Sequence, residues 1–203
     1  MSHTTSHLSI SLDGFISGPD QNLENPIGTR GLELHDWHWG DERATEADEV
    51  ATGWLMRRRG ANVMGRNMFG PIRGEWDAEW RGWWGAEPPY HAPVFVLTHH
   101  ARESIEMEGG TTFHFVTGGF ADAYAQACAV AGEDSVHIAG GASTVRQALN
   151  AGVIDELTLD IIPVLLGSGE RLFDGIESFG FEPVEVLHSP LATHVRYRRV
   201  RRV

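Results

Sequence analysis

The sequence predicts an α/β fold of three layers, in which a mainly parallel central sheet has an antiparallel edge near the C-terminus. Two patterns predict it. Short strand-like runs alternate with segments of helical spacing, which is typical of crossover units in parallel sheets. The last two strand-like runs lie close enough in the sequence to form a hairpin, which gives the antiparallel edge. At 203 residues the chain is long enough for one complete core, so we expect a single domain over residues 1–203.

The expected strands are short runs that are either apolar throughout or alternate between polar and apolar residues. The alternation of HLSISL and the apolar run of PVFVL are clear examples of the two patterns. A turn at Ser189-Pro190 separates the last two runs. In chain order the predicted strands are 6–12, 61–65, 93–100, 111–119, 135–139, 155–167, a run around 184–186, and 193–203.

Helices are expected between these strands, at 45–58, 119–131 and 142–151. Apolar residues share one face of the first helix, and Gly60 is well placed to end it. Two long segments, 17–40 and 70–93, show no regular spacing. The second carries Trp76, Trp80, Trp83 and Trp84 among prolines and glycines, and we expect it to form an extended loop that covers the mouth of the active site.

Composition excludes several classes of function. All 16 basic residues are arginine, so Schiff-base chemistry and phosphate loops that need a lysine are excluded. The single cysteine, Cys128, cannot form an internal disulfide or a cysteine-rich zinc site. A net charge of −12 argues against nucleic-acid binding, although a small anion can still bind in a local cationic pocket. No run is apolar enough to span a membrane, and we expect a cytoplasmic protein.

Three predicted strand ends carry residues suited to an anionic ligand. Gly140 and Gly141 stand between a strand and a helix, where free backbone N–H groups and the helix dipole favour an anion. The run VMGRNMF (63–69) places Arg66 in a similar turn, and VLTHHARE (96–103) carries Thr98, two histidines and Arg102 at the end of a strand. Ligands of parallel sheets lie outside the carboxyl ends of the strands, so three such ends can share one extended ligand. Taken singly, each is equally compatible with a tight turn or a solvated surface.

The motifs also resemble the dihydrofolate reductase superfamily, in the branch that contains the reductase domain of riboflavin biosynthesis. The similar segments are SLDGFISG, VMGRNMF, PVFVLTHH, IAGGASTVRQAL and VIDELTLDIIPVLLGSGERLF, which occur in the family's order between residues 8 and 173. The resemblance implies the dihydrofolate reductase-like fold and an NADPH-dependent reductase that transfers a hydride directly to a small heterocyclic or carbonyl substrate. Such chemistry needs no lysine, metal or protein nucleophile.

The resemblance also implies the residues that would hold NADPH. Those expected near the phosphates and adenosine are Gly65, Arg66, Asn67, Met68, Thr98 and His99. Those expected at the pyrophosphate are Gly140, Gly141, Ala142, Ser143 and Thr144, and Phe15 and Ile16 are expected to border the nicotinamide.

Two carboxylates are candidates for a catalytic role. Dihydrofolate reductases use a carboxylate on the first helix, and Asp48 is the nearest match here, with Glu49 one position away. Beside apolar walls such a group would have a raised pKa and could act as a general acid. The alternative is that Asp48 is an ordinary acid in the first helical turn. Asp36 is the second candidate, because it could reach the substrate from the long loop.

Two other functions remain open from the sequence. A protein of the same fold could bind a nucleotide without turning it over. A metal-dependent hydrolase could use the histidines of LHDWHWGDE (34–42), although this stretch is not a known zinc motif, and we expect no metal. Apart from its small-molecule ligands the chain is expected to form a homodimer, because the run 155–167 is apolar on both faces and such surfaces are normally covered.

Overall fold

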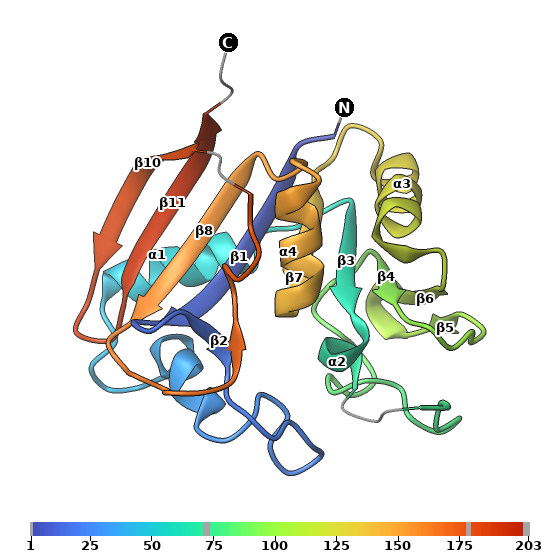
Figure 1. Cartoon of the computed structure of the whole chain (residues 1–203), viewed down its shortest axis with the longest axis horizontal. Helices are drawn as coiled ribbons and strands as arrows, with labels where there is room; N and C mark the ends of the chain where they lie inside the picture. Colours follow the sequence, from blue (N-terminus) through green and yellow to red (C-terminus); the bar gives the residue numbers. More distant parts are fainter. Residues whose placement is uncertain (1, 71–73, 178–179, 201–203) are drawn as a thin grey trace.

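The computed structural model describes residues 2–70, 74–177 and 180–200. One nine-stranded sheet runs through the molecule in the order β10-β11-β8-β1-β7-β3-β4-β6-β5 (Figure 1). Its strands are β1 (Thr4–Ser11), β3 (Ala61–Gly65), β4 (Pro93–Leu97), β5 (Ile105–Glu106), β6 (Thr112–Val116), β7 (Val136–Gly140), β8 (Glu156–Ile162), β10 (Gly180–His188) and β11 (Thr193–Val200). A small separate pair joins β2 (Phe15–Ser17) to β9 (Glu170–Arg171).

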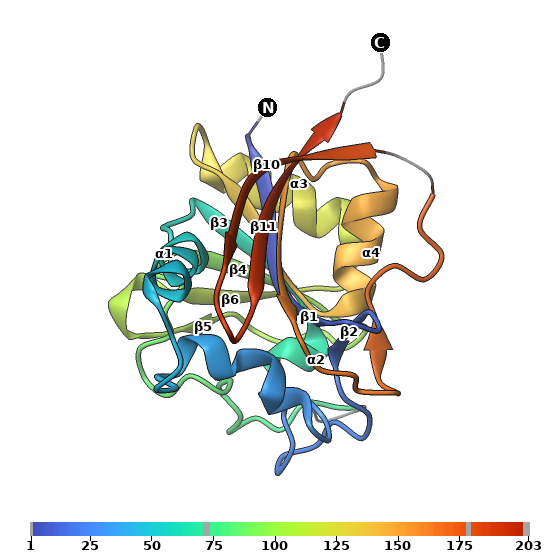
Figure 2. The same cartoon turned by 90° about the vertical axis from the view of Figure 1, so that its left-hand side faces the viewer.

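Strand directions confirm the predicted α/β class. The inner strands β8, β1, β7, β3, β4 and β6 run parallel, whereas β10 and β11 form an antiparallel hairpin at one edge. Short β5 pairs antiparallel at the other edge. Helices cover both faces: α3 (Gly119–Ala131) and α4 (Ala142–Asn150) lie on one side, and α1 (Glu46–Leu55) lies on the other (Figure 2). The remaining helices are short: α2 (Arg66–Phe69) and the 3₁₀ segments η1 (Gly31–His38) and η2 (Glu108–Gly110).

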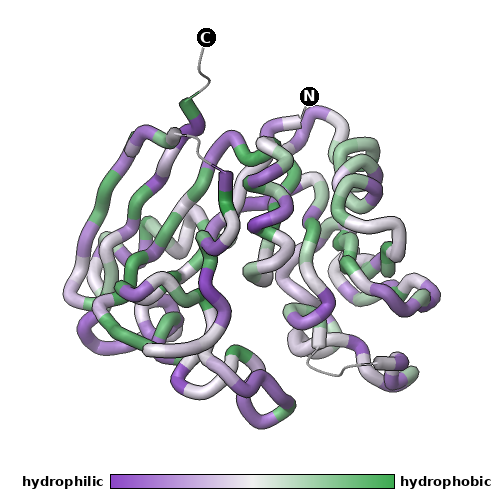
Figure 3. Tube along the Cα trace, in the orientation of Figure 1, coloured by the Kyte–Doolittle hydropathy of each residue, from purple (hydrophilic) through white to green (hydrophobic). Residues whose placement is uncertain are grey.

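The two faces of the central strands differ in chemistry because side chains alternate along a strand. Leu8 and Ile10 of β1 face the main core together with residues of α3 and α4. Hydrophobic residues also follow α3 and the central strands in Figure 3. On the opposite face β1 carries His7 and Ser9, which are buried although they are polar. The alternation of HLSISL therefore produces one apolar face and one buried polar face.

The end of the first helix and the content of one predicted loop differ from the expectation. Helix α1 ends at Leu55 rather than near 58, because the Arg59 guanidinium turns back and donates to the Trp54 carbonyl oxygen at 3.1 Å. Gly60 does not end the helix; a Cβ there would lie 2.7 Å from Asp134 Cβ, so the glycine permits a close approach of two segments. The segment expected as an unstructured loop at 17–40 contains η1, and β2 ends at its first residue, Ser17.

The homodimer was predicted from the apolar run 155–167, and the fold gives this run a different setting. The strand predicted over 155–167 is shorter, since β8 ends at Ile162, and it lies inside the sheet between β1 and β11. Leu157, Leu159 and Ile162 of this strand are buried within the chain, whereas Leu165 beyond it is 62% exposed. The strand has no free edge, and the homodimer stays a prediction that the fold does not test. In the described part of the chain, no helix has the length and apolar character needed to cross a membrane.

Candidate functional site

A cleft of about 1600 Å³ runs along the carboxyl ends of β3, β4 and β7 and continues over the polar face of β1. Nearly all of the residues predicted to hold a dinucleotide line this cleft, and Phe15 is the exception. The lining members are Ile16, Gly65, Arg66, Asn67, Met68, Thr98, His99, Gly140, Gly141, Ala142, Ser143 and Thr144. Phe15 is buried instead among Leu34, Trp37 and their neighbours.

Glycines allow the end of β3 and the turn between β7 and α4 to come close together in the middle of the cleft. A Cβ on Gly65 would lie 2.8 Å from Thr144 Oγ1, so β3 and the start of α4 are in close contact there. Gly140 has a φ of 139°, which favours glycine, and its peptide bond to Gly141 is cis. A Cβ built on Gly141 would meet no atom within 4 Å. The wall in front of the α4 N-terminus is therefore open space, where a helix presents backbone N–H groups to an anion.

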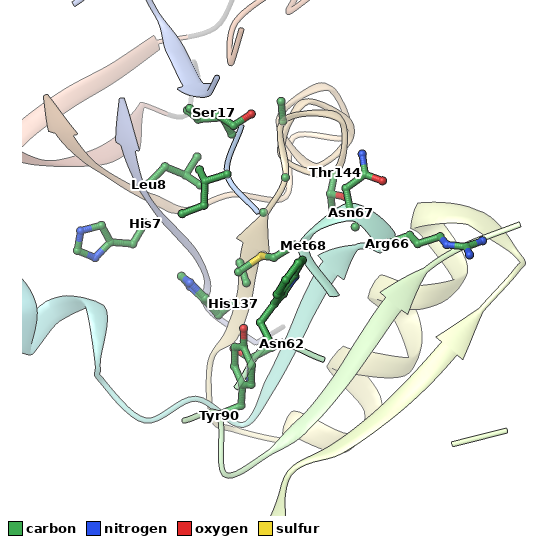
Figure 4. Close-up of a pocket in the computed structure, with 18 of the residues that line it drawn as sticks. His7, Leu8, Ser17, Asn62, Arg66, Asn67, Met68, Tyr90, His137 and Thr144 are labelled. Atoms are coloured by element: carbon green, nitrogen blue, oxygen red, sulfur yellow. The ribbon is translucent and has the colours of Figure 1, made fainter. Parts of the chain in front are cut away.

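Arg66 lies at the rim of this open wall and is already oriented by an aromatic ring. Its guanidinium carbon lies 3.8 Å from the centroid of the Trp76 ring, and its Nη2 donates to the Glu75 carbonyl oxygen at 3.4 Å. Trp76 is fixed in turn by a 2.7 Å bond from its Nε1 to the His100 carbonyl oxygen. In Figure 4 the Arg66 side chain extends away from the inner cluster of polar residues. The cation is thus held at the outer part of the cleft.

Thr98 and His99 follow β4 and take different positions. Thr98 is buried, and its hydroxyl is engaged locally because it accepts from the His100 backbone N–H at 3.1 Å. His99 is exposed and lines the cleft. Of the two, His99 has the freer side chain for a ligand.

The inner part of the cleft borders a buried row of ionisable residues, of which only Asp48 was a candidate from the sequence. His7 Nε2 lies 2.8 Å from Asp160 Oδ2, and His194 Nδ1 lies 2.7 Å from Asp160 Oδ1. The other nitrogen of His194 lies 3.2 Å from Asp48 Oδ1. The ring of Trp37 covers the row, with its centroid 4.8 Å from that of His194. Asp48, His194, Asp160 and His7 therefore form one continuous chain of hydrogen-bonding groups.

The protonation of this row follows from its contacts. Burial acts to lower the pKa of His194, but Asp160 and Asp48 outweigh it, and the net direction is upward. Burial acts to raise the pKa of Asp160, but the charge of His7 and the bond from His194 hold it below the ordinary value. Both nitrogens of His194 face carboxylate oxygens, which suits a doubly protonated ring. His194 is thus an imidazolium between two carboxylates.

Asp48 occupies a place different from the one expected of a general acid. It is the third residue of α1 and closes a capping box with Thr45, whose backbone N–H donates to Oδ2 at 2.7 Å. Its Oδ1 accepts from Ser189 Oγ at 2.8 Å. Burial acts to raise the pKa of Asp48, but the bonds from Thr45, Ser189 and His194 lower it overall, so the expectation of a raised pKa is wrong. Asp48 is not among the lining residues and reaches the cleft through His194 and Asp160.

Asp36, the second catalytic candidate, is exposed on η1 and is also not among the lining residues. Its neighbours His35 and His38 do line the cleft, with Nδ1 of the first 3.2 Å from Nε2 of the second. Burial and the adjacent His38 lower the pKa of His35 to about 4, so this pair is neutral near pH 7. Within residues 2–70, 74–177 and 180–200, no three His, Cys, Asp or Glu side chains group as ligands for a metal ion.

Buried polar atoms without partners lie on the same wall. Among the described residues, His7 Nδ1 and Asn62 Nδ2 have no hydrogen-bond partner, although His7 is only 5% and Asn62 only 3% exposed. Both residues line the cleft. His137 lies between them in the sheet, since it pairs with Thr5 on β1 and with Asn62 on β3. Burial and the nearby charge of Arg59 place the pKa of His137 well below the ordinary value, so this ring is neutral.

The comparisons with known proteins agree with this architecture. A family model described as the RibD C-terminal domain matches residues 2–190. No curated protein sequence matches the chain. A solved structure from Shewanella sp. PV-4, assigned to riboflavin biosynthesis, has 26% identity and a TM-score of 0.67, and the match covers 98% of this chain and 99% of that one.

Two further structures share the fold at lower identity. The dihydrofolate reductase of Enterococcus faecalis, solved as a complex with NADP(H), has 15% identity and a TM-score of 0.54, with 97% of this chain and 96% of that one covered. A deaminase/5-amino-6-(5-phosphoribosylamino)uracil reductase of Thermotoga maritima has 15% identity and a TM-score of 0.57; the match covers 98% of this chain but 57% of that one. With a mostly parallel sheet and a family model that spans most of its length, the chain has a reductase-type fold and belongs to the RibD C-terminal domain family.

Proposed function

We propose that this protein is a reductase that uses NADPH to reduce a small heterocyclic or carbonyl substrate in the cleft. The observation that carries the proposal is the open wall at Gly141, in front of the N-terminus of α4 and beside the Gly65–Thr144 contact. A dinucleotide phosphate needs this combination of backbone N–H groups and space without a Cβ. The NADP(H)-bound dihydrofolate reductase of Enterococcus faecalis, which shares the fold, supports the choice of cofactor.

The size of the cleft fits two ligands at once. Drug-sized ligands occupy pockets of about 300 to 1,000 Å³, so a volume of about 1600 Å³ leaves room for a dinucleotide and a second small molecule. The outer part, with Arg66 and the α4 N-terminus, suits the charged phosphates. The inner part, with His7 and Asn62, suits a neutral polar molecule. Each ligand thus has its own half of the cleft.

When bound, a nicotinamide cofactor supplies the hydride. The residues of this chain then have to position the cofactor and the substrate and to provide for protonation of the substrate. Ile16 on β2 borders the cleft beside the polar face of β1 and can pack against a flat ring. The α4 N-terminus and Arg66 would fix the phosphates, which sets how far the reactive end reaches along the cleft. A protein that bound the nucleotide without turnover would share this outer half, and substrate-dependent oxidation of NADPH separates the two functions.

Arg66→Ala is expected to weaken NADPH binding about tenfold to a hundredfold, because a charged hydrogen bond contributes roughly 1.5–3 kcal/mol. The effect on NADH should be smaller if the arginine contacts the 2′-phosphate. Titration calorimetry of the wild type and of Arg66→Ala with NADPH and with NADH measures these affinities. Arg43→Ala removes the same charge from an exposed residue paired with Asp41, and it should leave both affinities unchanged. Absence of binding by folded wild-type protein would end the proposal.

NADPH is expected to quench the tryptophan fluorescence, because Trp83 and Trp84 line the cleft. Trp83→Phe should remove part of the quenching with little loss of stability, since the ring is half-buried and contacts Trp80 at its edge. Trp84 packs on the fully buried Phe113, so Trp84→Ala should also lower the melting temperature. Trp54→Phe, on α1 and outside the cleft lining, is the control. Equal quenching in the wild type and Trp83→Phe would place this segment away from the ligand.

A further inference from the structure

The cleft has the opposite charge balance from the chain as a whole. The chain contains 28 acidic residues and 16 basic ones, all of them arginine. Among the described residues that line the cleft, in contrast, four are arginines and two are acidic. The acidic ones are Asp160, which two histidines contact, and Glu170 on β9. The arginines are Arg57, Arg58, Arg59 and Arg66. The cleft is therefore a place that attracts anions in a protein that otherwise repels them.

These arginines lie at two separate places along the cleft. Arg66 directly follows β3, beside the wall proposed for the dinucleotide phosphates, whereas the other three precede β3. The five residues of β3 separate the two places by roughly 16 Å, at about 3.3 Å per residue. Figure 4 shows His137 and Tyr90 well apart from Arg66, and the charge of Arg59 acts on His137. The far place is thus distinct from the α4 N-terminus and suits a second anion.

Arg59 supplies a buried positive charge at this far place. Its guanidinium donates to three backbone carbonyl oxygens and to the Thr5 hydroxyl, which are all neutral acceptors. The carboxylate whose charge acts on it is Glu156, which Arg196 already binds at 2.9 Å. Burial and the charge of Arg57 lower the pKa of Arg59 to about 10, so the group is still charged near pH 7. Arg59 adds to the positive potential without a donor left for a ligand.

Arg57 and Arg58 are the side chains that can contact an anion there. Both are exposed and line the cleft. Within residues 2–70, 74–177 and 180–200, neither forms an ion pair. They follow the end of α1 at Leu55, where the chain leaves the helix to enter β3. Two cations without a carboxylate partner therefore stand at the mouth of the cleft.

Exposed apolar side chains accompany these two arginines. Leu32, Trp39 and Met56 are 48%, 56% and 64% exposed, and all three line the cleft. Met56 directly precedes Arg57, and η1, which carries Leu32 and ends just before Trp39, packs on α1 through a shared buried cluster. A ligand that covers these side chains removes apolar surface from water, which favours its binding. This side of the cleft thus combines an apolar wall with cations.

We propose that the substrate is an amphiphilic organic anion whose apolar body packs on Leu32, Trp39 and Met56 and whose oxyanion binds Arg57 and Arg58. The inference rests on the proposed reductase function and names its substrate class; the reducible group would lie farther inside the cleft. A guanidinium binds a carboxylate or a phosphate ester through two parallel hydrogen bonds, so both are suitable oxyanions. A sugar phosphate would satisfy the arginines but not the apolar wall, which favours an aromatic or aliphatic acid.

Anilinonaphthalene sulfonate is the probe for this site, because it joins apolar rings to one oxyanion and fluoresces when bound. Phenylnaphthylamine, which has the same rings without the sulfonate, is its neutral counterpart. Arg57→Gln/Arg58→Gln should weaken the sulfonate about tenfold and the neutral probe little. Arg43→Gln/Arg198→Gln removes the same charge from exposed residues outside the cleft lining and should weaken neither probe. Failure of the wild type to bind the sulfonate, or equal affinities in the two double variants, contradicts the proposal.

The apolar wall is tested with the same pair of probes. Met56→Ser should weaken both probes, whereas Val130→Ser, at a 54% exposed position on α3 outside the cleft lining, should weaken neither. Added salt should weaken the sulfonate and not the neutral probe, because salt screens an exposed charge. Phenylbutyrate should displace the sulfonate, and ribose phosphate at the same concentration should not. Equal displacement by the sugar phosphate would show that the apolar wall does not select the ligand.

Competition with NADP⁺ separates this inference from the proposed function. Saturating NADP⁺ should leave the sulfonate bound, because the cofactor phosphates and the probe use different arginines. Displacement of the probe by NADP⁺ would assign Arg57 and Arg58 to the cofactor and overturn the inference, while supporting a dinucleotide site. Failure of the wild type to bind NADP⁺ would instead count against the proposed function, and the probe results would still decide whether the anion site exists.

Discussion

Gly141→Val is expected to weaken both NADPH and NADH at least a hundredfold while the protein stays folded. The backbone at Gly141 has φ −77° and ψ −164°, values that other residues adopt, and a Cβ there would meet no protein atom within 4 Å. The branched side chain would therefore occupy the cleft in front of the α4 N-terminus, where the phosphates must approach the backbone N–H groups. Gly141→Ala should give a smaller loss, because it fills less of the same space.

A matched control separates blocked binding from damage to the fold. Gly53→Val also introduces its Cβ into open space, but on α1 and outside the cleft lining. Calorimetry should show unchanged dinucleotide affinity for Gly53→Val and lost affinity for Gly141→Val, with similar melting temperatures for both. If Gly141→Val binds NADPH as tightly as the wild type, the cofactor does not lie on the α4 N-terminus, and the proposed function loses its main support.

The outer half of the cleft was predictable because its signals are local. A glycine turn between a strand and a helix lies within a few residues, as at 140–144 and 65–68, and parallel strand ends meet at one edge of the sheet. The fold class followed from the same local patterns. The early end of α1 could not be predicted from local patterns. It depends on the buried Arg59, which lies beyond the helix and donates to the Trp54 carbonyl oxygen.

The inner half was not predictable because its contacts join distant parts of the chain. His7 and Asp160 are 153 residues apart, and His194 and Asp48 are 146 apart, so no spacing in the sequence connects them. The alternation of HLSISL indicates a strand, but it does not reveal that η1 and Trp37 cover the polar face. Asp48 was singled out as a carboxylate of the first helix; its partner His194 could be found only from the pairing of β11 with β8.

Asp160→Ala is expected to lower the free energy of unfolding by about 3–5 kcal/mol, a typical cost of removing one partner from a buried ion pair. The substitution would leave the buried imidazolium of His194 with Asp48 as its remaining anion and would take the partner from His7 Nε2. Asp160→Asn keeps one oxygen acceptor and should cost less. Urea unfolding of the three proteins measures the difference. Asp41→Ala removes a half-buried carboxylate whose partner, Arg43, is exposed, and it should cost at most about 1 kcal/mol.

The pH dependence of that difference identifies the ion pair as its source. The pKa of Asp160 is lowered, so its contribution is present above the unfolded value of about 3.8 and is lost as the pH falls through the folded value. The pKa of His194 is raised, so its contribution is complete below its unfolded value of about 6.5 and is lost as the pH rises through the folded value. The stability difference between the wild type and Asp160→Ala should therefore be largest at about pH 5–6 and should shrink in more alkaline buffer. A difference below about 1 kcal/mol at every pH would show that the buried row is not ionised as its geometry indicates.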